Sequence, residues 1–367
     1  MSLPRRGAEA FERSINRTSG TPRQILEIPL GVYFREKAQA TRAIGPARKP
    51  PYLRCRSNNQ KWIGRVGQMA YQLWTSPITG YRRKGTRLAD LRSVLGAGIV
   101  LRTIFEPLQC CPSDAPANDI KRILDERGFD VAGVQAVQNG PVIGFVVRET
   151  LRSGSVKEHT SPMKADHLIS DATPLCDLLA VLREKERVFV RVGSEVKGIV
   201  TRADLNKPPV RVYLFGLVSL LEMHLQFWVR RAYADESWKQ KLKKDRLGAA
   251  EKLQVDRRGR NDEITVLDCL QFCDKCDLFL ASKELRAKLG LASKGQAERV
   301  LKGAEALRNR LAHSQQDLVQ GSSWKAQIEL IEKIEELVHR SDDTVEQEAK
   351  SARKSVDELW VGGQTAS

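Results

Sequence analysis

Arg308 and His313, near the C-terminal end of the chain, are the residues whose types and spacing could do chemistry. Four residues separate them, and Asn309 follows the arginine, in the stretch Leu307-Arg-Asn-Arg-Leu-Ala-His-Ser314. A guanidinium keeps its charge in a protein, whereas an imidazole exchanges a proton near neutrality. Together they supply a fixed cation and a proton carrier, and these groups can promote phosphodiester cleavage without a metal ion.

The helix that must position these residues is predicted over residues 293–312. Ser293 and Gln296 have capping-box spacing, which fixes the start of the helix. Apolar residues recur along it with helical periodicity: Ala297, Val300, Leu301, Ala304, Leu307 and Leu311. Arg308 falls inside this apolar stripe, where a charge must be desolvated or meet a partner. His313 would lie about 140° from Arg308 on an unbroken helix. Convergence therefore requires that the helix end near Ala312 or that the two side chains come from two chains.

Helical patterns continue on both sides of this segment, over residues 208–340. A long helix is predicted from the apolar face between Leu214 and Val229, and others over residues 237–255, 264–280 and 324–340. This succession of helices predicts an up-and-down bundle.

The motif and its helical setting resemble the HEPN family, whose members carry an Arg-x4-6-His pattern with a polar residue after the arginine. The resemblance covers residues 208–340. It implies a metal-independent endoribonuclease, often a toxin or defence effector, that acts as a homodimer with both motifs facing one cleft. Carried over by position, Arg308 would stabilise charge on the phosphate, His313 would act as general acid or base, and Asn309 would assist by hydrogen bonding.

The implied reaction is attack of a 2′-hydroxyl on its own phosphate, which leaves a 2′,3′-cyclic end on the RNA. Glu222, at the edge of the apolar face of the long helix, is a weaker candidate for a carboxylate that orients Arg308 or His313. The alternative interpretation of the pair is a surface helix end with an ordinary ion pair, because short motifs recur by chance.

An internal repeat is predicted between residues 96 and 206. A helix over residues 116–127 precedes two strands over 129–137 and 141–147, and a helix over 174–182 precedes two strands over 187–192 and 195–200. Gly144-Phe-Val-Val-Arg-Glu-Thr-Leu151 aligns with Gly198-Ile-Val-Thr-Arg-Ala-Asp-Leu205 at an offset of 54 residues. A fixed offset with the same order of elements indicates a duplicated unit.

The second of these stretches resembles the closing part of a CBS motif, and two in tandem resemble a CBS pair. The resemblance covers about 110 residues and implies an adenine nucleotide, such as ATP, ADP or AMP, bound between the repeats as a regulator. By position, Thr201 would contact phosphate and Asp204 would contact ribose. The first repeat departs from the pattern, with Val147 and Thr150 at these positions, so at most one site keeps it. The alternative is that Asp204 merely caps a turn in a structural or dimerising module.

Positive charge is concentrated at the start of the chain. Residues 1–92 hold 19 Lys and Arg against 5 acidic residues, a net of +14 out of +16 for all 367 residues. Such a segment can bind RNA or DNA through phosphates, with Trp62, Tyr71, Trp74 and Tyr81 available to stack on bases. The alternative is a disordered extension, or an upstream stretch that is not part of the natural product.

The overall composition limits which class of protein the chain can be. The chain is 41% hydrophobic and 29% charged, which is typical of soluble globular proteins. Seven cysteines at no disulfide-framework spacing, and no signal-peptide run, favour the cytoplasm. The longest apolar run, residues 212–221, is too short for a membrane span. No Gly-rich phosphate loop is present.

Three cysteines, Cys269, Cys273 and Cys276, are spaced as on one face of the helix predicted over 264–280. One helix cannot wrap a tetrahedral metal ion, and no fourth ligand is near, so they are interpreted as small core residues and no metal site is predicted.

The predicted fold class is therefore α+β, in four parts: a basic low-order segment (1–92), a CBS-like pair (93–206), a HEPN-like helical bundle (207–342) and a polar tail (343–367). The leading hypothesis is a cytoplasmic, homodimeric, adenine-nucleotide-regulated endoribonuclease that needs no cofactor for catalysis. Two other hypotheses are a non-catalytic regulatory or interaction protein, and a nucleic-acid-binding protein driven by its basic segment.

Overall fold

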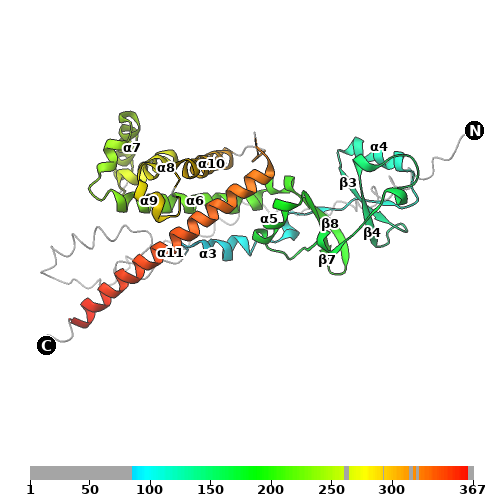
Figure 1. The fold of residues 1–367 in the computed structure, drawn as a ribbon, viewed down its shortest axis with the longest axis horizontal. Helices are drawn as coiled ribbons and strands as arrows, with labels where there is room; N and C mark the ends of the chain where they lie inside the picture. The colour runs from blue at the N-terminus through cyan, green and yellow to red at the C-terminus, as the bar shows by residue number, and fades with distance from the viewer. Residues whose placement is uncertain (1–84, 260–263, 292, 314–316, 320–321, 363–367) are drawn as a thin grey trace, which may run out of the picture.

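The computed structural model describes residues 85–259, 264–291, 293–313, 317–319 and 322–362. A strand-rich part lies at one end of the molecule and a helical part at the other (Figure 1). The aromatic residues of the basic N-terminal segment and its proposed nucleic-acid contacts lie outside the described residues. The described residues form a mixed α+β fold with two four-stranded sheets.

The two repeats have the same order of elements. The first contains β2 (Cys110–Pro112), α4 (Ala117–Arg127), β3 (Val131–Gln135) and β4 (Val142–Val147). The second contains β6 (Leu168–Ser170), α5 (Leu175–Glu184), β7 (Arg187–Val192) and β8 (Glu195–Thr201). In each, the first strand pairs parallel with the second, which pairs antiparallel with the third. The predicted helix–strand–strand repeat is confirmed, with a short leading strand in each copy that the sequence analysis missed.

A further short strand crosses from each repeat to the sheet of the other. β1 (Glu106–Pro107) precedes the first repeat but pairs antiparallel with β8 of the second. β5 (Ser161–Pro162) holds the same position before the second repeat and pairs antiparallel with β4 of the first. The register places Pro107 opposite Gly198 and Pro162 opposite Gly144. Proline lacks an N–H and suits an edge strand, so each sheet ends there in the same way.

The repeats differ in what they pack against. The first repeat has a separate hydrophobic core made of residues from α4 and the β3–β4 sheet, with Leu151 and Val156. The second repeat shares one core with the helical part, to which it contributes Leu175, Leu178, Leu179, Leu182, Val188, Val190, Val200 and Leu205. Phe145 of β4 contacts Phe189 of β7, with ring centroids 4.9 Å apart, so the two sheets touch through aromatic rings.

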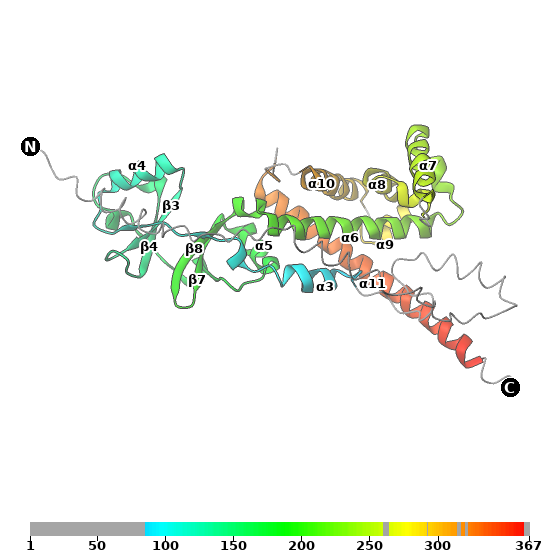
Figure 2. The ribbon, with the colours of Figure 1, turned by 180° about the vertical axis from the view of Figure 1, so that it is seen from behind.

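The helical part is organised around α6 (Pro208–Ala232), which α8 (Phe272–Ala281), α10 (Lys294–Ala312) and α11 (Trp324–Gly362) contact (Figure 2). α3 (Leu88–Leu91) and the π-helical turn Arg92–Gly96 also pack against α6. The last residues of the segment expected to have low order are thus helical. The backbone N–H of Leu88 donates to Asp342 Oδ2 of α11 at 2.7 Å.

α6 is long and apolar enough to span a membrane by length and composition alone. In this fold 67% of its most apolar window is buried within the molecule, as in the core helix of a globular protein. Packing therefore accounts for most of its apolar surface, although Val212 and Phe215 are exposed.

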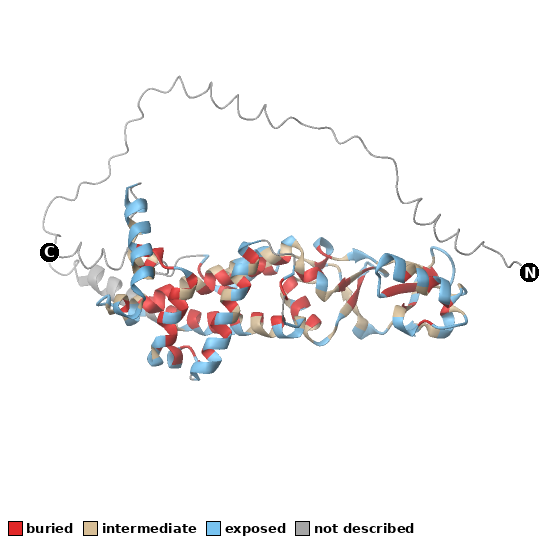
Figure 3. Ribbon diagram, turned by 90° about the horizontal axis from the view of Figure 1, so that it is seen from above, coloured by how far each residue is buried: buried red, intermediate tan, exposed pale blue. Residues whose placement is uncertain are grey.

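Several helices differ from their predicted bounds. Residues 237–255 form a 3-10 helix (Ser237–Lys241) and α7 (Lys244–Arg258), whose one buried residue is Ala250 and which stands away from the body (Figure 3). α9 (Lys283–Lys288) was not predicted. α11 continues from the predicted end at Arg340 to Gly362, into the stretch expected to be a polar tail, because buried Val345 and Ala349 extend its apolar side.

The helix predicted over residues 264–280 is broken, which changes the interpretation of the cysteines. A 3-10 helix (Val266–Cys269) begins with a capping box between Thr265 and Asp268, and a second capping box, between Gln271 and Asp274, begins α8. Each box satisfies N–H groups that a continuous helix would use, so the helix restarts. The three cysteines therefore do not share one helix. Cys276 is fully buried and Cys269 nearly so.

Replacing Gly198 with alanine is expected to destabilise the fold. An added Cβ would lie 2.3 Å from the Phe105 ring and 3.0 Å from the Glu106 carbonyl oxygen, so β1 and β8 would have to separate. We expect a loss of about 1–3 kcal/mol in the free energy of unfolding, typical of overpacking. Urea denaturation measures it. The control is Gly248→Ala on α7, where a Cβ meets nothing within 4 Å. An equal loss in the control would contradict the prediction.

Candidate functional sites

The end of α10 carries the Arg308/His313 motif. The side chain of Ser293 accepts from the backbone N–H of Gln296, as the capping-box spacing predicted. All six residues of the predicted apolar stripe are buried. The helix ends at Ala312, and His313 is its C-cap residue, with φ −91° and ψ 12°. The predicted helix end before His313 is therefore confirmed.

Arg308 and His313 both reach the surface. Arg308 is half-buried rather than desolvated within the stripe, and its Nη1 donates to Asn309 Oδ1 at 3.3 Å. His313 is exposed, and its backbone N–H donates to the Asn309 carbonyl oxygen at 3.0 Å. Among the contacts of the described residues, none joins Arg308 to His313. Within a single chain, therefore, the guanidinium of Arg308 and the imidazole of His313 are both accessible but do not converge on one site.

Arg310, which the sequence analysis did not select, lies deeper in the same helix end. Its Nη2 donates to Gln327 Oε1 of α11 at 3.1 Å, and its carbonyl oxygen accepts from Arg211 Nη2 of α6 at 3.2 Å. Burial lowers the pKa of the Arg310 guanidinium, and the carboxylate of Asp317 acts in the opposite direction. The signal that could have found this residue is its i, i+3 spacing to His313, which places both on one side of a helix.

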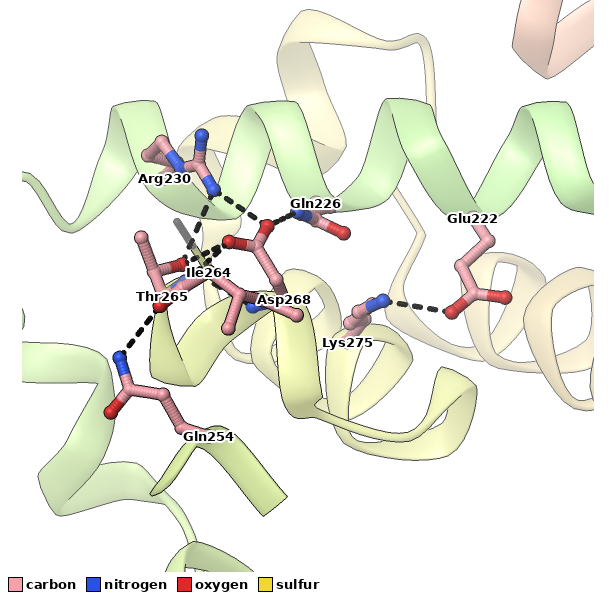
Figure 4. Close-up of polar contacts among 8 residues, drawn as sticks. All are labelled: Glu222, Gln226, Arg230, Gln254, Ile264, Thr265, Asp268 and Lys275. Carbon is pink, nitrogen blue, oxygen red and sulfur yellow. Dashed lines mark hydrogen bonds and ion pairs between the residues drawn. The ribbon is translucent and has the colours of Figure 1, made fainter. Parts of the chain in front are cut away.

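Glu222 lies on α6 and faces α8 (Figure 4). Its Oε1 accepts from Lys275 Nζ at 2.7 Å, and the Lys275 side chain is only 4% exposed. Nearby, Asp268 accepts from Arg230 and Gln226 of α6 and from Thr265 in its own capping box. In this arrangement the Glu222 carboxylate balances a buried ammonium group, and within the described part of the chain its hydrogen bond and ion pair are made with Lys275, not with Arg308 or His313.

The second candidate site lies where β8 ends. Asp204 Oδ2 accepts from the backbone N–H of Thr201 at 2.7 Å and from its hydroxyl at 3.1 Å. Asp204 Oδ1 pairs with Lys207 Nζ at 2.8 Å, and Lys207 also contacts Glu106 of β1 and the carbonyl oxygen of Ile104. Burial lowers the pKa of Lys207, but the bonds to Asp204 and Glu106 outweigh it and leave this pKa raised.

The structure thus brings Thr201 and Asp204 together, in the turn-capping arrangement that was the alternative interpretation of Asp204. Capping and ligand binding are compatible, because a carboxylate has about four lone-pair positions. The first repeat is built differently. Thr150 donates to the Val147 carbonyl oxygen at 2.8 Å, and Arg148 pairs with Asp130 at 2.9 Å.

No protein-family profile matches the sequence, and no curated protein is similar to it at a significant level. Similar solved structures include an uncharacterized conserved protein from Pyrococcus horikoshii, with 17% identity, 30% of this chain and 90% of that chain covered, and a TM-score of 0.27. The CBS-pair protein CBSX2 from Arabidopsis thaliana has 19% identity over 31% of this chain and 94% of that one, with a TM-score of 0.27.

A third similar structure is the CBS domain of a bacterial CNNM/CorC family Mg2+ transporter in complex with ATP. It has 16% identity over 31% of this chain and 88% of that chain, with a TM-score of 0.26. At such identities and TM-scores the likeness carries no conclusion about function. The chemistry of this chain must be inferred from its own residues.

Removing the Glu222 carboxylate is expected to reduce stability by leaving the Lys275 ammonium buried without a partner. Glu222→Ala should lose about 3 kcal/mol in the free energy of unfolding, as when a buried pair is broken from one side. Lys275→Met should change it by less than about 1 kcal/mol, because Glu222 is 28% exposed and can be solvated. Denaturant titration of the two variants and the double variant measures the coupling. Equal stability of Glu222→Ala and wild type would show that the pair contributes nothing.

Proposed function

We propose that this chain is an adenine-nucleotide-responsive protein in which the strand-rich repeats regulate the helical part. The observation that supports this proposal is the segment 201–207, which contains the Thr201–Asp204 turn and ends at Lys207, the N-cap residue of α6. A ligand at Asp204 would therefore act within three residues of the central helix of the helical part.

Two hydrogen bonds extend from this segment to the motif on α10. Asn206 Oδ1 accepts from the backbone N–H of Leu318 at 2.9 Å, in the connection that follows His313. Arg211, in the first turn of α6, donates to the Arg310 carbonyl oxygen at 3.2 Å. A displacement at the start of α6 would thus be felt directly at the end of α10.

The shared core supports transmission over this distance. α5 of the second repeat contributes leucines to the core that α6 and α11 form, and Arg183 of α5 pairs with Glu332 of α11 at 2.9 Å. Closely packed interiors do not deform continuously, so a shift of one element moves its neighbours. The second repeat therefore serves as part of the helical body, and the first repeat as the part able to move against it.

The ligand chemistry follows from the ion pair at Asp204. A ribose hydroxyl that donates to Asp204 would compete with the Lys207 ammonium for the same carboxylate. Lys207, 27% exposed, could then pair with a phosphate of the ligand. Binding would thus replace Asp204 by a ligand phosphate as the partner of Lys207, the N-cap residue of α6. The bound and free states would then differ in their contacts at the start of α6.

We propose RNA cleavage as the output of the helical part. The observation that favours it is the helix end between Arg308 and His313, which leaves the imidazole exposed at the C-terminus of α10, where it can reach a substrate. In this reaction a 2′-oxygen forms a bond to phosphorus and loses its proton, while the bond from phosphorus to the 5′-oxygen breaks and that oxygen gains a proton. His313 would transfer protons, Arg308 would stabilise the charged phosphate, and Asn309 would donate a hydrogen bond.

A homodimer that brings two α10 ends together would supply two such sets of groups to one cleft. If the helical part is instead an interaction module, the regulatory proposal remains and only the output changes. Incubation with RNA distinguishes a ribonuclease from an interaction module.

Calorimetric titration with ATP, ADP and AMP tests the nucleotide site. We expect wild type to bind at least one of them, and Asp204→Ala to lose at least tenfold in affinity, because the ribose contact is removed. Thr150→Ala, at the corresponding position of the first repeat, should bind as wild type does. A thermal melt of each variant shows whether it is folded. Unchanged binding by folded Asp204→Ala would refute this placement of the site.

Incubation of purified protein with RNA in the presence of a chelator tests cleavage, with and without each nucleotide. We expect products with 2′,3′-cyclic ends, and a decrease in rate of about 10²-fold or more for His313→Ala and Arg308→Ala, since each removes proton transfer or charge stabilisation.

The matched control is Arg299→Ala, an exposed arginine on the same helix, which should cleave at the wild-type rate. A substrate with a 2′-deoxy residue at the cleaved position should resist cleavage. Cleavage that persists in both Arg308→Ala and His313→Ala would remove these residues from the mechanism. No cleavage by wild type under any nucleotide condition would favour the interaction module.

A further inference from the structure

Two buried hydrogen-bond donors lie next to each other where α10 meets the start of α11. Arg310 Nε and Gln327 Nε2 are inaccessible to solvent and have no hydrogen-bond partner among the residues that the structure describes. The two side chains contact each other through Arg310 Nη2 and Gln327 Oε1. A buried donor left without an acceptor costs about 1–3 kcal/mol, more when it is charged. In folded proteins such a group is usually satisfied by a water molecule, an ion or a ligand.

The contact between Arg310 and Gln327 shows whether the missing partner is a hydrogen-bond donor or an acceptor. Because Arg310 can only donate, the Gln327 atom that it meets must be the oxygen, and the remaining Gln327 atom must be the amide nitrogen. Both unpaired groups are therefore donors, and Gln327 is only 3% exposed. The ligand that satisfies them is an acceptor.

The surrounding charge favours an anion. Gln327 lies in the first turn of α11, where the helix dipole is positive, and that turn contains no acidic residue. Ser323 caps this end by accepting from the Ala326 N–H at 3.2 Å, and exposed Lys325 adds a positive charge. The carboxylate of Asp317 opposes this effect, since it interacts favourably with the Arg310 guanidinium.

We propose that Arg310 and Gln327 form a phosphate-binding subsite beside His313. Arg310 and His313 are three residues apart, so they lie on neighbouring positions of one helix side, whereas Arg308 lies about 140° from His313. If the proposed RNA cleavage holds, this inference names the arginine that binds the scissile phosphate. One chain then supplies a cation and an imidazole from the same side of the end of α10.

The test uses the full chain and inorganic phosphate as the probe. Phosphate is titrated against sodium chloride at matched ionic strength, and the melting temperature is followed. A ligand that binds only the folded state raises this temperature as its concentration exceeds the dissociation constant. We expect a phosphate-specific rise for wild type, its loss in Arg310→Leu and its reduction in Gln327→Leu. Arg299→Leu, with the same change of charge on the same helix, should keep the full rise.

A merely structural role for Arg310 predicts a different pattern. In phosphate-free buffer Arg310→Leu should melt at or above the wild-type temperature, because an incompletely paired buried cation is replaced by an apolar side chain. A lower melting temperature, together with a retained phosphate-dependent rise, would overturn the inference. The absence of any phosphate-specific rise in wild type would also overturn it.

The failures of the two proposals are distinguishable. If wild type cleaves RNA and Arg310→Lys and Arg310→Leu cleave it equally well, this subsite is wrong while the cleavage proposal stands. If wild type cleaves no RNA but loses its phosphate response in Arg310→Leu, the subsite stands and the ribonuclease proposal falls. His313→Ala should keep the phosphate response, since its proposed role is proton transfer rather than binding.

Discussion

The need to bury α6 is the constraint on which the rest of the structure depends. Its buried residues, from Val210 to Val229, lie on most sides of the helix and include Tyr213 and Trp228. A helix that is apolar nearly all round must be covered nearly all round. α8, α10 and α11 cover it together with α3 and residues of the second repeat. The second repeat is therefore joined to the helical part by burial as well as by sequence.

Polar and charged side chains connect α6 to the surrounding elements at several points along its length. Lys207, the residue before α6, pairs with Asp204 and with Glu106 of β1. Glu222, in the middle of α6, pairs with the buried Lys275 of α8. His224 Nδ1 and Trp228 Nε1 share the Ser341 hydroxyl of α11 further along. Each of these contacts joins α6 to a different element, so a change at one end of α6 is resisted along its length. This stiffness is what the proposed regulation requires.

Much of the fold could be predicted because it depends on local periodicity. The repeat, with the bounds of β7 and β8, and the start and end of α10 follow from patterns within a few residues. What could not be predicted depends on distant partners. β1 and β5 are two residues long and exist only because β8 and β4 lie beside them. The break before α8 depends on two capping carboxylates that a periodic pattern does not reveal.

The candidate sites show the same division. Thr201 and Asp204 are three residues apart, and their contact is local, whereas the partner of Glu222 comes from α8 and that of Arg310 from α11. A helical wheel places Arg308 in the apolar stripe, but the long side chain reaches the surface by extending past its neighbours. Tertiary packing therefore decides which arginine is enclosed.

The exchange of β1 and β5 between the sheets limits how the repeats can move. Since β1 comes before the first repeat and is held by β8, the chain passes from one sheet to the other at both ends of that repeat. Both pairings lie within a sheet, so separation of the two sheets would not break them, but it would have to extend the link between β1 and β2, which is only Leu108 and Gln109. This short link favours sliding or twisting of one sheet past the other over wide opening. The pairing of β1 with β8 also means that this sheet cannot be completed during synthesis until β8 has been made, long after β1. The β1–β8 pairing is therefore non-local and forms late.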